Sequence, residues 1–117
     1  MIYIVEDDSS VRRSFEILLE SVGLEFKSFA SAELFLSDVS PSNHDLLLLD
    51  IKLPGMNGLD LLDTLVQEKK SIPAIVITSV EDEHTRKACK RYGVKALLRK
   101  PVDSETLIDL IHYHRQA

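Results

Sequence analysis

Residues whose side chains can do chemistry stand at the ends of four short apolar segments of this sequence. They are Glu6, Asp7, Asp8, Asp50, Thr78 and Lys100. Carboxylates that lie close together repel one another, and a hard cation such as Mg²⁺ relieves that repulsion because it prefers oxygen ligands. A lysine ammonium suits an anion, and a threonine hydroxyl can donate a hydrogen bond to it. If these side chains meet in space, they describe a magnesium-dependent site for phosphoryl transfer.

The segments that carry these residues have the character of buried strands. Strands are predicted over residues 1–5, 24–29, 46–49, 74–78 and 96–98. After each of them, apolar residues recur at helical spacing, so that five helices are predicted as well. Short strands that are apolar on both faces and alternate with helices indicate a parallel sheet covered on both sides. Right-handed crossovers and the short chain favour an open, doubly wound α/β sheet over a closed barrel.

The apolar stripes of the helices predict which residues face the sheet. Ser9 or Ser10 can cap the first helix, whose inward face includes Val22. The third helix is predicted to turn Val66 inward. Residues 82–92 also look helical, but their apolar residues are few, so this helix is predicted to be only weakly amphipathic.

Asp50 directly follows four leucines, at a place where a carboxylate is poor core material. Alone, it could simply start the turn at Pro54 and Gly55. In a doubly wound sheet, however, ligands bind at the carboxyl ends of the strands, and all the polar residues named above lie at such ends. We therefore predict that they converge at one edge of the sheet.

Length and composition narrow the class of protein. The 117 residues suit one domain, spanning 1–117, and the net charge of −5 argues against direct contact with nucleic acid. Cys89 is the only cysteine, so no internal disulfide can form and a reducing compartment fits. No apolar run approaches the roughly 20 residues of a membrane helix, and the acidic start is unlike a signal peptide. A cytoplasmic protein without membrane contact is expected.

Four motifs together resemble the receiver domain of bacterial two-component response regulators. They are IVEDD, LLLLDIKLPGMNG, IVITS and LLRKP, in this order along the chain. The resemblance covers essentially the whole sequence. It implies a flavodoxin-like fold, in which a five-stranded parallel sheet of strand order 2-1-3-4-5 is covered by five helices.

The resemblance implies a role for each site residue. Asp50 would be the phosphoacceptor, with Thr78 and Lys100 bonding the transferred phosphoryl group. The Mg²⁺ ligands would be Glu6 (through water), Asp7, Asp50 and the backbone carbonyl of Lys52. Asp8 would serve the start of the first helix, and a cis peptide bond would join Lys100 to Pro101. Such a domain is no enzyme in the usual sense, because it catalyses only its own phosphorylation and a slow autodephosphorylation.

The resemblance also implies partners and a switch. The phosphoryl group would come from a sensor histidine kinase, and the phosphorylated domain would form a homodimer. The face made by the fourth helix, fifth strand and fifth helix would control an output, typically transcription through a C-terminal DNA-binding domain absent from this chain. Leu97 stands where relatives carry Tyr or Phe, and Val102 where they often carry Phe. Activation is therefore expected without the aromatic rotamer change of the family.

Two other functions stay open on the sequence alone. A flavodoxin-like cofactor binder would need a phosphate-binding loop rich in Ser, Thr or Gly after the first strand, where this chain has three acids. A receiver-like protein that binds partners without phosphorylation would lack one or more of the acids, the threonine or the lysine, and this chain keeps them all. The histidines are scattered, and no histidine metal site is expected. They are His44, His84, His112 and His114.

Overall fold

The structure, a computed structural model, describes residues 1–79 and 82–115. Strands and helices alternate along them: β1 (Ile2–Val5), α1 (Ser9–Ser21), β2 (Phe26–Phe29), α2 (Ala32–Asp38), β3 (Leu46–Leu49), α3 (Gly58–Gln67), β4 (Ala74–Thr78), α4 (Glu83–Arg91), β5 (Ala96–Arg99) and α5 (Ser104–His114). All strand pairs are parallel, and the sheet has the order β2-β1-β3-β4-β5. The predicted doubly wound fold and its strand order are confirmed.

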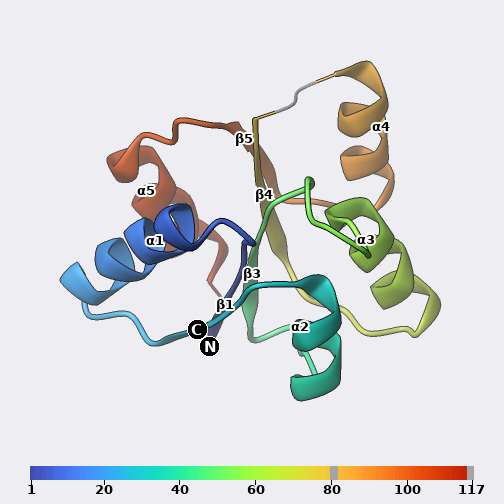
Figure 1. Ribbon diagram of the computed structural model, residues 1–117, viewed down its shortest axis with the longest axis horizontal. Helices are drawn as coiled ribbons and strands as arrows, with labels where there is room; N and C mark the ends of the chain where they lie inside the picture. Colours follow the sequence, from blue (N-terminus) through green and yellow to red (C-terminus); the bar gives the residue numbers. More distant parts are fainter. Residues whose placement is uncertain (80–81, 116–117) are drawn as a thin grey trace.

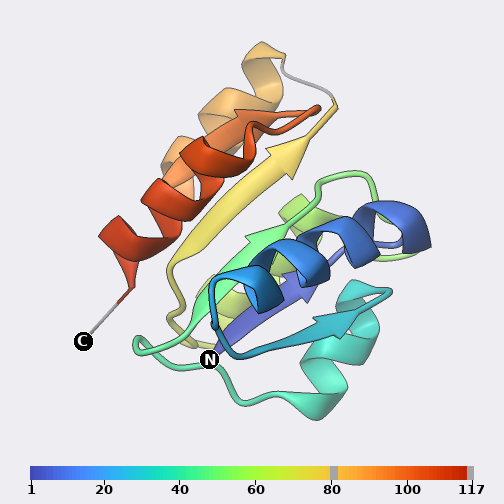
Figure 2. The same cartoon turned by 90° about the vertical axis from the view of Figure 1, so that its left-hand side faces the viewer.

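The register of the strands brings their carboxyl ends to one edge of the sheet. Val5, the last residue of β1, lies beside Phe29 on β2 and Leu49 on β3. On the other side of the sheet, Thr78 at the end of β4 lies beside Arg99 at the end of β5. Figure 2 shows the strand arrows pointing the same way. Residues that directly follow these ends are therefore brought to the same rim.

Helices cover both faces of the sheet, with α1 and α5 on one side and α2, α3 and α4 on the other (Figure 1). Alternate residues of the central strands supply the two apolar layers. Leu46 and Leu48 belong to the layer under α1 and α5, whereas Leu47 and Leu49 belong to the opposite layer. All residues of β3 and β4 are buried. Burial on both faces explains why these strands are continuously apolar.

Acids and an asparagine, rather than serines, cap several helices. The carboxylate of Asp8 accepts hydrogen bonds from the backbone N–H groups of Ser10 and Val11. Our prediction of a serine cap for α1 is therefore wrong, while the expectation that Asp8 serves the helix start is confirmed. Asn57 caps α3 in a capping box with Asp60, so that this helix begins at Gly58.

Two predicted inward residues face solvent instead. Val22 is 42% exposed because α1 ends at Ser21, so this residue lies beyond the last helical turn. Val66 is 56% exposed, and Leu61 takes the buried position that the sequence left unassigned. Among the described residues, no helix has the length and apolar character needed to cross a membrane.

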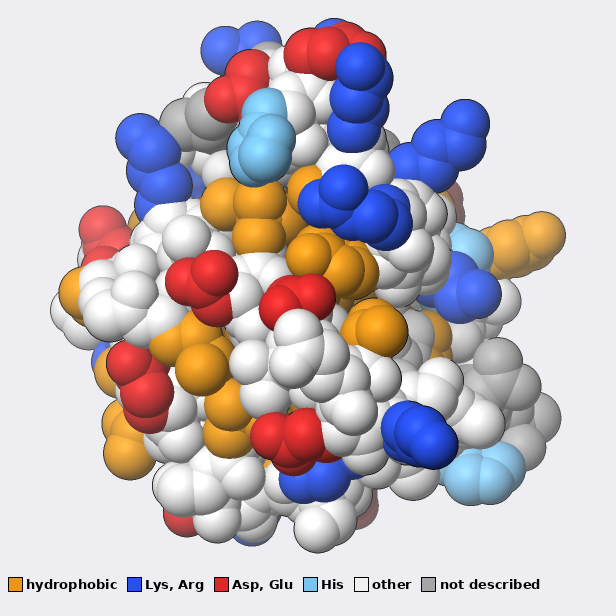
Figure 3. Space-filling view, turned by 90° about the vertical axis from the view of Figure 1, so that its right-hand side faces the viewer, with side chains coloured by type: hydrophobic (Ala, Val, Ile, Leu, Met, Phe, Trp, Pro, Cys, Tyr) orange, Lys and Arg blue, Asp and Glu red, His pale blue; other side chains and the backbone are white. Residues whose placement is uncertain are grey.

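Helix α4 is more clearly amphipathic than predicted. Thr85, Ala88 and Cys89 are buried on one face, at the spacing of neighbours on a helix, and charged residues occupy the rest. Figure 3 faces this side of the molecule and shows Lys and Arg side chains gathered in its upper part, where α4 lies. The buried stripe of α4 is narrow and is made of small side chains. Tyr92, just after the helix, is half-buried and donates from its hydroxyl to Asp63 of α3 (3.3 Å).

Candidate functional site

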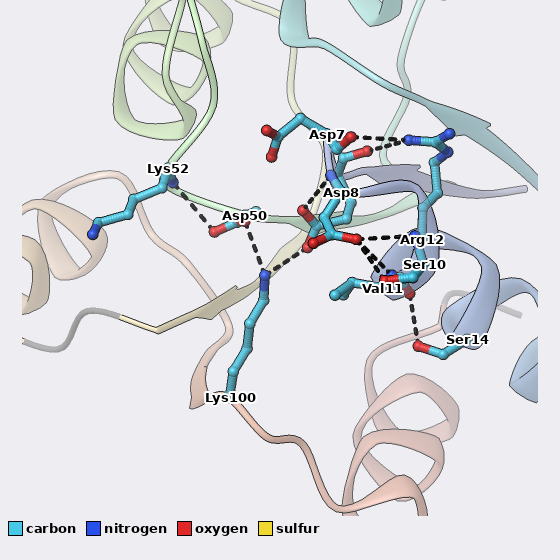
Figure 4. A network of polar contacts seen from close by, with 10 residues as sticks. Asp7, Asp8, Ser10, Val11, Arg12, Ser14, Asp50, Lys52 and Lys100 are labelled. Carbon is cyan, nitrogen blue, oxygen red and sulfur yellow. Dashed lines mark hydrogen bonds and ion pairs between the residues drawn. The ribbon is translucent and has the colours of Figure 1, made fainter.

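Three carboxylates meet at the rim formed by the ends of β1 and β3. Glu6, Asp7 and Asp50 each place one oxygen within 4.8 Å of the others. The pairing of the strands causes this, because the N–H of Asp50 donates to the carbonyl of Val5 (3.1 Å) and sets residue 50 beside residue 6. Figure 4 shows Asp7 and Asp50 around the same space, with Lys100 reaching in from below. The predicted convergence of these acids is confirmed.

The carboxylate of Asp50 is buried and oriented from two sides. Only 6% of Asp50 is exposed. One oxygen, Oδ1, accepts from the backbone N–H of Lys52 at 3.2 Å, and Oδ2 accepts from the ammonium of Lys100 at 3.0 Å. A carboxylate held in one orientation at a strand end is well placed to react with a group that approaches the rim.

Glu6 is more deeply buried, with 2% of its surface exposed. Its Oε1 accepts from the ammonium of Lys100 at 2.7 Å, and its Oε2 accepts from the N–H of Asp8 at 3.2 Å. Burial raises the pKa of the Glu6 carboxyl; the hydrogen bond from Lys100 opposes this rise, and the nearby charge of Asp50 adds to it. Burying an acid beside another acid is costly, and Lys100 offsets part of that cost.

Lys100 therefore acts as the counter-ion of the rim. Its ammonium is shared between Glu6 and Asp50. Burial by itself would lower the pKa of this ammonium, but the hydrogen bonds to the two carboxylates outweigh burial and raise the pKa. The peptide bond from Lys100 to Pro101 is cis, as the resemblance implied.

The donor set fits a hard divalent cation. It contains three carboxylates, of which Glu6 and Asp50 are buried while Asp7 is exposed and accessible from solvent. Mg²⁺ prefers such oxygen ligands and keeps several waters, which the open side at Asp7 allows. The hydrogen bond from the N–H of Lys52 to the carboxylate of Asp50 places Lys52 next to the site. The expectation that its carbonyl binds the metal stays a prediction.

Thr78 ends β4 on the other side of the rim and is completely buried. Its backbone carbonyl accepts from the N–H of Lys100 at 2.9 Å, so the two residues that were predicted to bond a phosphoryl group come from neighbouring strand ends. This link couples the position of Lys100 to that of Thr78. The role of the threonine hydroxyl stays a prediction.

Two residues at the rim were missed from the sequence. Arg12 of α1 donates to the carbonyls of Glu6 (2.8 Å) and Asp7 (3.4 Å). Glu33 of α2 accepts from the N–H of Met56 (3.0 Å) and so holds the loop that follows Asp50. No residue pattern singled them out, because their partners are backbone groups. The one available signal was that Arg12 follows Asp8 by one helical turn, which turns its side chain toward the start of the helix.

Comparison with known proteins agrees with this geometry. The family described as "Response regulator receiver domain" matches residues 2–112. Nodulation protein W of Bradyrhizobium diazoefficiens is 37% identical over 111 residues, which are 95% of this chain and 49% of that protein. The DNA-binding transcriptional regulator NtrC of Klebsiella pneumoniae is 34% identical over 119 residues, covering 97% of this chain and 25% of that protein.

A solved structure leads to the same family. The response regulator StyR superposes with a TM-score of 0.89 at 34% identity, over 97% of this chain and 57% of that chain. The present chain thus spans about half or less of the length of the two curated relatives above. The family match over nearly the whole length, together with the strand order and the acidic rim, leads to one conclusion. This chain belongs to the response regulator receiver domain family.

Proposed function

We propose that this chain is the phosphoacceptor domain of a two-component response regulator and that Asp50 accepts the phosphoryl group. The observation that carries the proposal is the setting of Asp50. It is a buried carboxylate at a strand end, oriented by Lys52 and Lys100 and adjoined by two further acids. A structural aspartate at the start of a turn would need neither the lysine nor the second and third carboxylates.

In the proposed reaction, a carboxylate oxygen of Asp50 attacks the phosphorus of a phosphohistidine on a sensor kinase. The bond from phosphorus to the histidine nitrogen breaks, and its electron pair stays on that nitrogen. Bound Mg²⁺ supplies charge that neutralises the phosphoryl oxygens. Asp7, Asp50 and the backbone carbonyl of Lys52 would hold the cation, and Glu6 would contact it through water.

After transfer, the phosphoryl group needs donors of its own. Lys100, which already bonds Asp50 at 3.0 Å, turns to a phosphoryl oxygen, and the hydroxyl of Thr78 donates to another. The domain catalyses only this transfer to itself and the slow loss of the group. It acts on no other substrate.

The proposed readout lies at α4, β5 and α5. The donors drawn to the phosphoryl group are at the ends of β4 and β5, so their movement changes the surface built on those strands. Leu97 on β5 has no hydroxyl and no ring, so the change takes place without an aromatic rotamer switch. We propose that the changed face forms a homodimer in which this domain makes no direct contact with DNA.

The output is proposed to be transcription, controlled by a DNA-binding domain beyond this chain, in the cytoplasm. Two facts support this. NtrC, which is similar over 97% of this chain, bears the name of a DNA-binding transcriptional regulator and is about four times as long. The net charge of −5 makes the present domain itself a poor binder of nucleic acid.

The acceptor is tested with a small-molecule phosphodonor such as acetyl phosphate, in the presence of Mg²⁺, followed by mass mapping of the adduct. The wild type should carry one phosphoryl group, on Asp50, and Asp50→Asn should carry none. Asp109→Asn removes the same charge from an exposed position on α5 and should label as the wild type does. Labelling of Asp50→Asn at the wild-type level would contradict the proposal.

The metal is tested in the same assay. Chelation should abolish labelling of the wild type, and Asp7→Ala should remove most of the labelling that Mg²⁺ supports, because Asp7 is the exposed member of the three acids. Normal labelling of Asp7→Ala, with an unchanged dependence on Mg²⁺, would show that the metal has been assigned to the wrong residues.

A further inference from the structure

Arg12 lies in the first turns of α1, and its side chain reaches back over the end of β1. One guanidinium nitrogen, Nη1, is 2.8 Å from the carbonyl oxygen of Glu6 and 3.4 Å from that of Asp7. Figure 4 shows the side chain of Arg12 directed at the backbone beside Asp7. The residue is half-buried, unlike its neighbour Arg13, which is exposed.

The backbone held by Arg12 is the one that carries two of the three rim acids. Glu6 has other restraints, since its N–H donates to Phe29 of β2 (3.0 Å) and its carboxylate bonds Lys100 and Asp8. Asp7 is exposed, and the direction of its side chain follows from the orientation of its own backbone. The hydrogen bond to the carbonyl of Asp7 is therefore a direct restraint on where that carboxylate points.

We propose that Arg12 is a positioning residue for the divalent cation. By holding the carbonyls of Glu6 and Asp7, it keeps the carboxylate of Asp7 within reach of those of Glu6 and Asp50. The inference rests on the metal site in the proposed function. It assigns to Arg12 no contact with the cation, and the residue acts only through the backbone of its two partners.

Electrostatics and positioning predict opposite results for the loss of Arg12. A guanidinium is always positive, and a positive charge near three carboxylates disfavours a second cation. If charge alone mattered, removal of Arg12 would tighten the binding of Mg²⁺. If Arg12 holds the ligands in place, its removal should weaken binding, and groups that orient metal ligands are typically worth about 10 to 100-fold in affinity.

Arg13 provides a matched control on the same helix. It carries the same charge one residue further on, but it donates to Glu16 (3.2 Å) and Glu20 (3.1 Å) rather than to the loop. Arg13→Met therefore removes one positive charge without touching the backbone of Glu6 and Asp7. Arg12→Lys is the second control, because it keeps the charge but replaces the planar fork by a single ammonium.

The experiment is a calorimetric titration of the chain with Mg²⁺ alone, without phosphodonor. Arg12→Met should raise the dissociation constant about 10-fold or more, whereas Arg13→Met should leave it unchanged or slightly lower. Arg12→Lys should fall between the wild type and Arg12→Met. The urea midpoint of each variant in chelator shows whether it is folded, and a purely structural role would change that midpoint and leave the affinity of the folded protein unaltered.

The titrations distinguish a failure of the role of Arg12 from a failure of the metal site. If Arg12→Met binds Mg²⁺ as tightly as the wild type, or more tightly, the positioning role is wrong and the metal site stands. If Arg12→Met does not fold, Arg12→Lys decides, and wild-type affinity in that variant overturns the inference. If the wild type itself takes up no Mg²⁺, the metal site of the proposed function fails, and the role of Arg12 fails with it.

Discussion

The two sides of the rim are built to different standards of packing. On the side of β1 and β3, all four residues of β3 are buried, and α3 packs Leu61, Leu62 and Leu65 into the same apolar layer as Leu47 and Leu49. On the side of β4 and β5, β4 is buried as well, but β5 has no fully buried residue, and α4 contributes only Thr85, Ala88 and Cys89 to the interior. Because burial stabilises in proportion to apolar area, β5 and α4 are held in place by less free energy than β3 and α3.

The difference in packing between the two sides coincides with a difference in their chemical roles. The three acids lie on the well-packed side, where a metal and an acceptor need fixed ligands. Thr78 and Lys100, which are proposed to follow the phosphoryl group, come from the side with the narrow helix contact. Segments with little buried apolar area move at the lowest cost in free energy. We call the side of β1 and β3 the firm side and the side of β4 and β5 the looser side. The comparison indicates that the charged ligands are held on the firm side and that the conformational change occurs on the looser side.

The largest contrast is expected from shortening one buried side chain on each side. Leu61→Ala should lower the free energy of unfolding by about 2–5 kcal/mol, because it leaves a cavity between α3 and β3. Cys89→Ala should cost about 1 kcal/mol, since it removes a single small group from under α4. Urea denaturation of both variants measures the difference. Equal losses would remove the packing distinction between the two sides.

The next effect concerns Lys100, which links the two sides. Lys100→Met leaves Glu6 and Asp50 buried without their counter-ion. Removing one partner of a buried ion pair costs about 3–5 kcal/mol, and the lower end applies because the side chain of Lys100 is 21% exposed. The loss should appear in chelator and shrink when Mg²⁺ is added. An equal loss under both conditions would mean that the cation does not bind beside these acids.

Gly58→Ala should cost about 1–3 kcal/mol through overpacking on the firm side. An added Cβ there would lie 2.4 Å from the backbone oxygen of Asp50 and 2.8 Å from the Cα of Ile51, and neither atom is free to move. Gly93→Ala, just after α4, meets no atom within 4 Å and costs only the strain of its positive φ, about 1–2 kcal/mol. Calorimetry should find weaker Mg²⁺ binding in Gly58→Ala alone. Normal binding by that variant would show that the approach of α3 does not shape the site.

The smallest effect is a dependence on pH at the start of α4. The carboxylate of Asp82 accepts from the N–H of Thr85 at 2.7 Å, and the hydrogen bonds to the backbone and hydroxyl of Thr85 lower its pKa from the ordinary value of 3.8. A depressed acid stabilises the fold above that ordinary value, and the contribution is lost as the pH falls through the lower pKa of the folded state. Asp82→Asn keeps a capping group but cannot titrate.

The wild type should therefore be slightly more stable than Asp82→Asn at pH 7, and the difference should shrink as the pH falls below the ordinary value of 3.8 and vanish below the lower pKa of the folded state. Urea midpoints of both proteins at pH 7, 4 and 3 measure this difference in stability. A difference that grows as the pH falls would contradict this account of the cap.

The strand order followed from the resemblance to receiver domains, whereas the convergence of Glu6, Asp50 and Lys100 followed from their places at the ends of the apolar segments. The reason is physical, because parallel strands joined by right-handed crossovers leave few arrangements, and all of them gather the carboxyl ends at one edge. Asp8 was harder to place. Aspartate and serine both cap helices well, so the sequence does not determine which of Asp8, Ser9 and Ser10 has the extended backbone of a cap.

The sequence pattern could not predict details that depend on side-chain packing or on hydrogen bonds to the backbone. Leu61, Leu62, Leu65 and Val66 are all apolar, so the sequence of α3 allows two inward faces, and only contact with the sheet selects the one that exposes Val66. Arg12 was missed for another reason. Its partners are carbonyl oxygens, which every residue possesses, so no residue type in the sequence marks them.

A phosphoryl group added at Asp50, on the side of β1 and β3, should change the structure on the side of β4 and β5. Amide hydrogen exchange, with and without Mg²⁺ and the phosphoryl mimic beryllofluoride, measures this change residue by residue. Exchange protection should change in residues 82–99, which include α4 and β5, while β1 and β3 keep their protection. In Thr78→Ala the change should be reduced. If the mimic binds and residues 82–99 exchange as before, or if β1 and β3 respond equally, the claim is wrong.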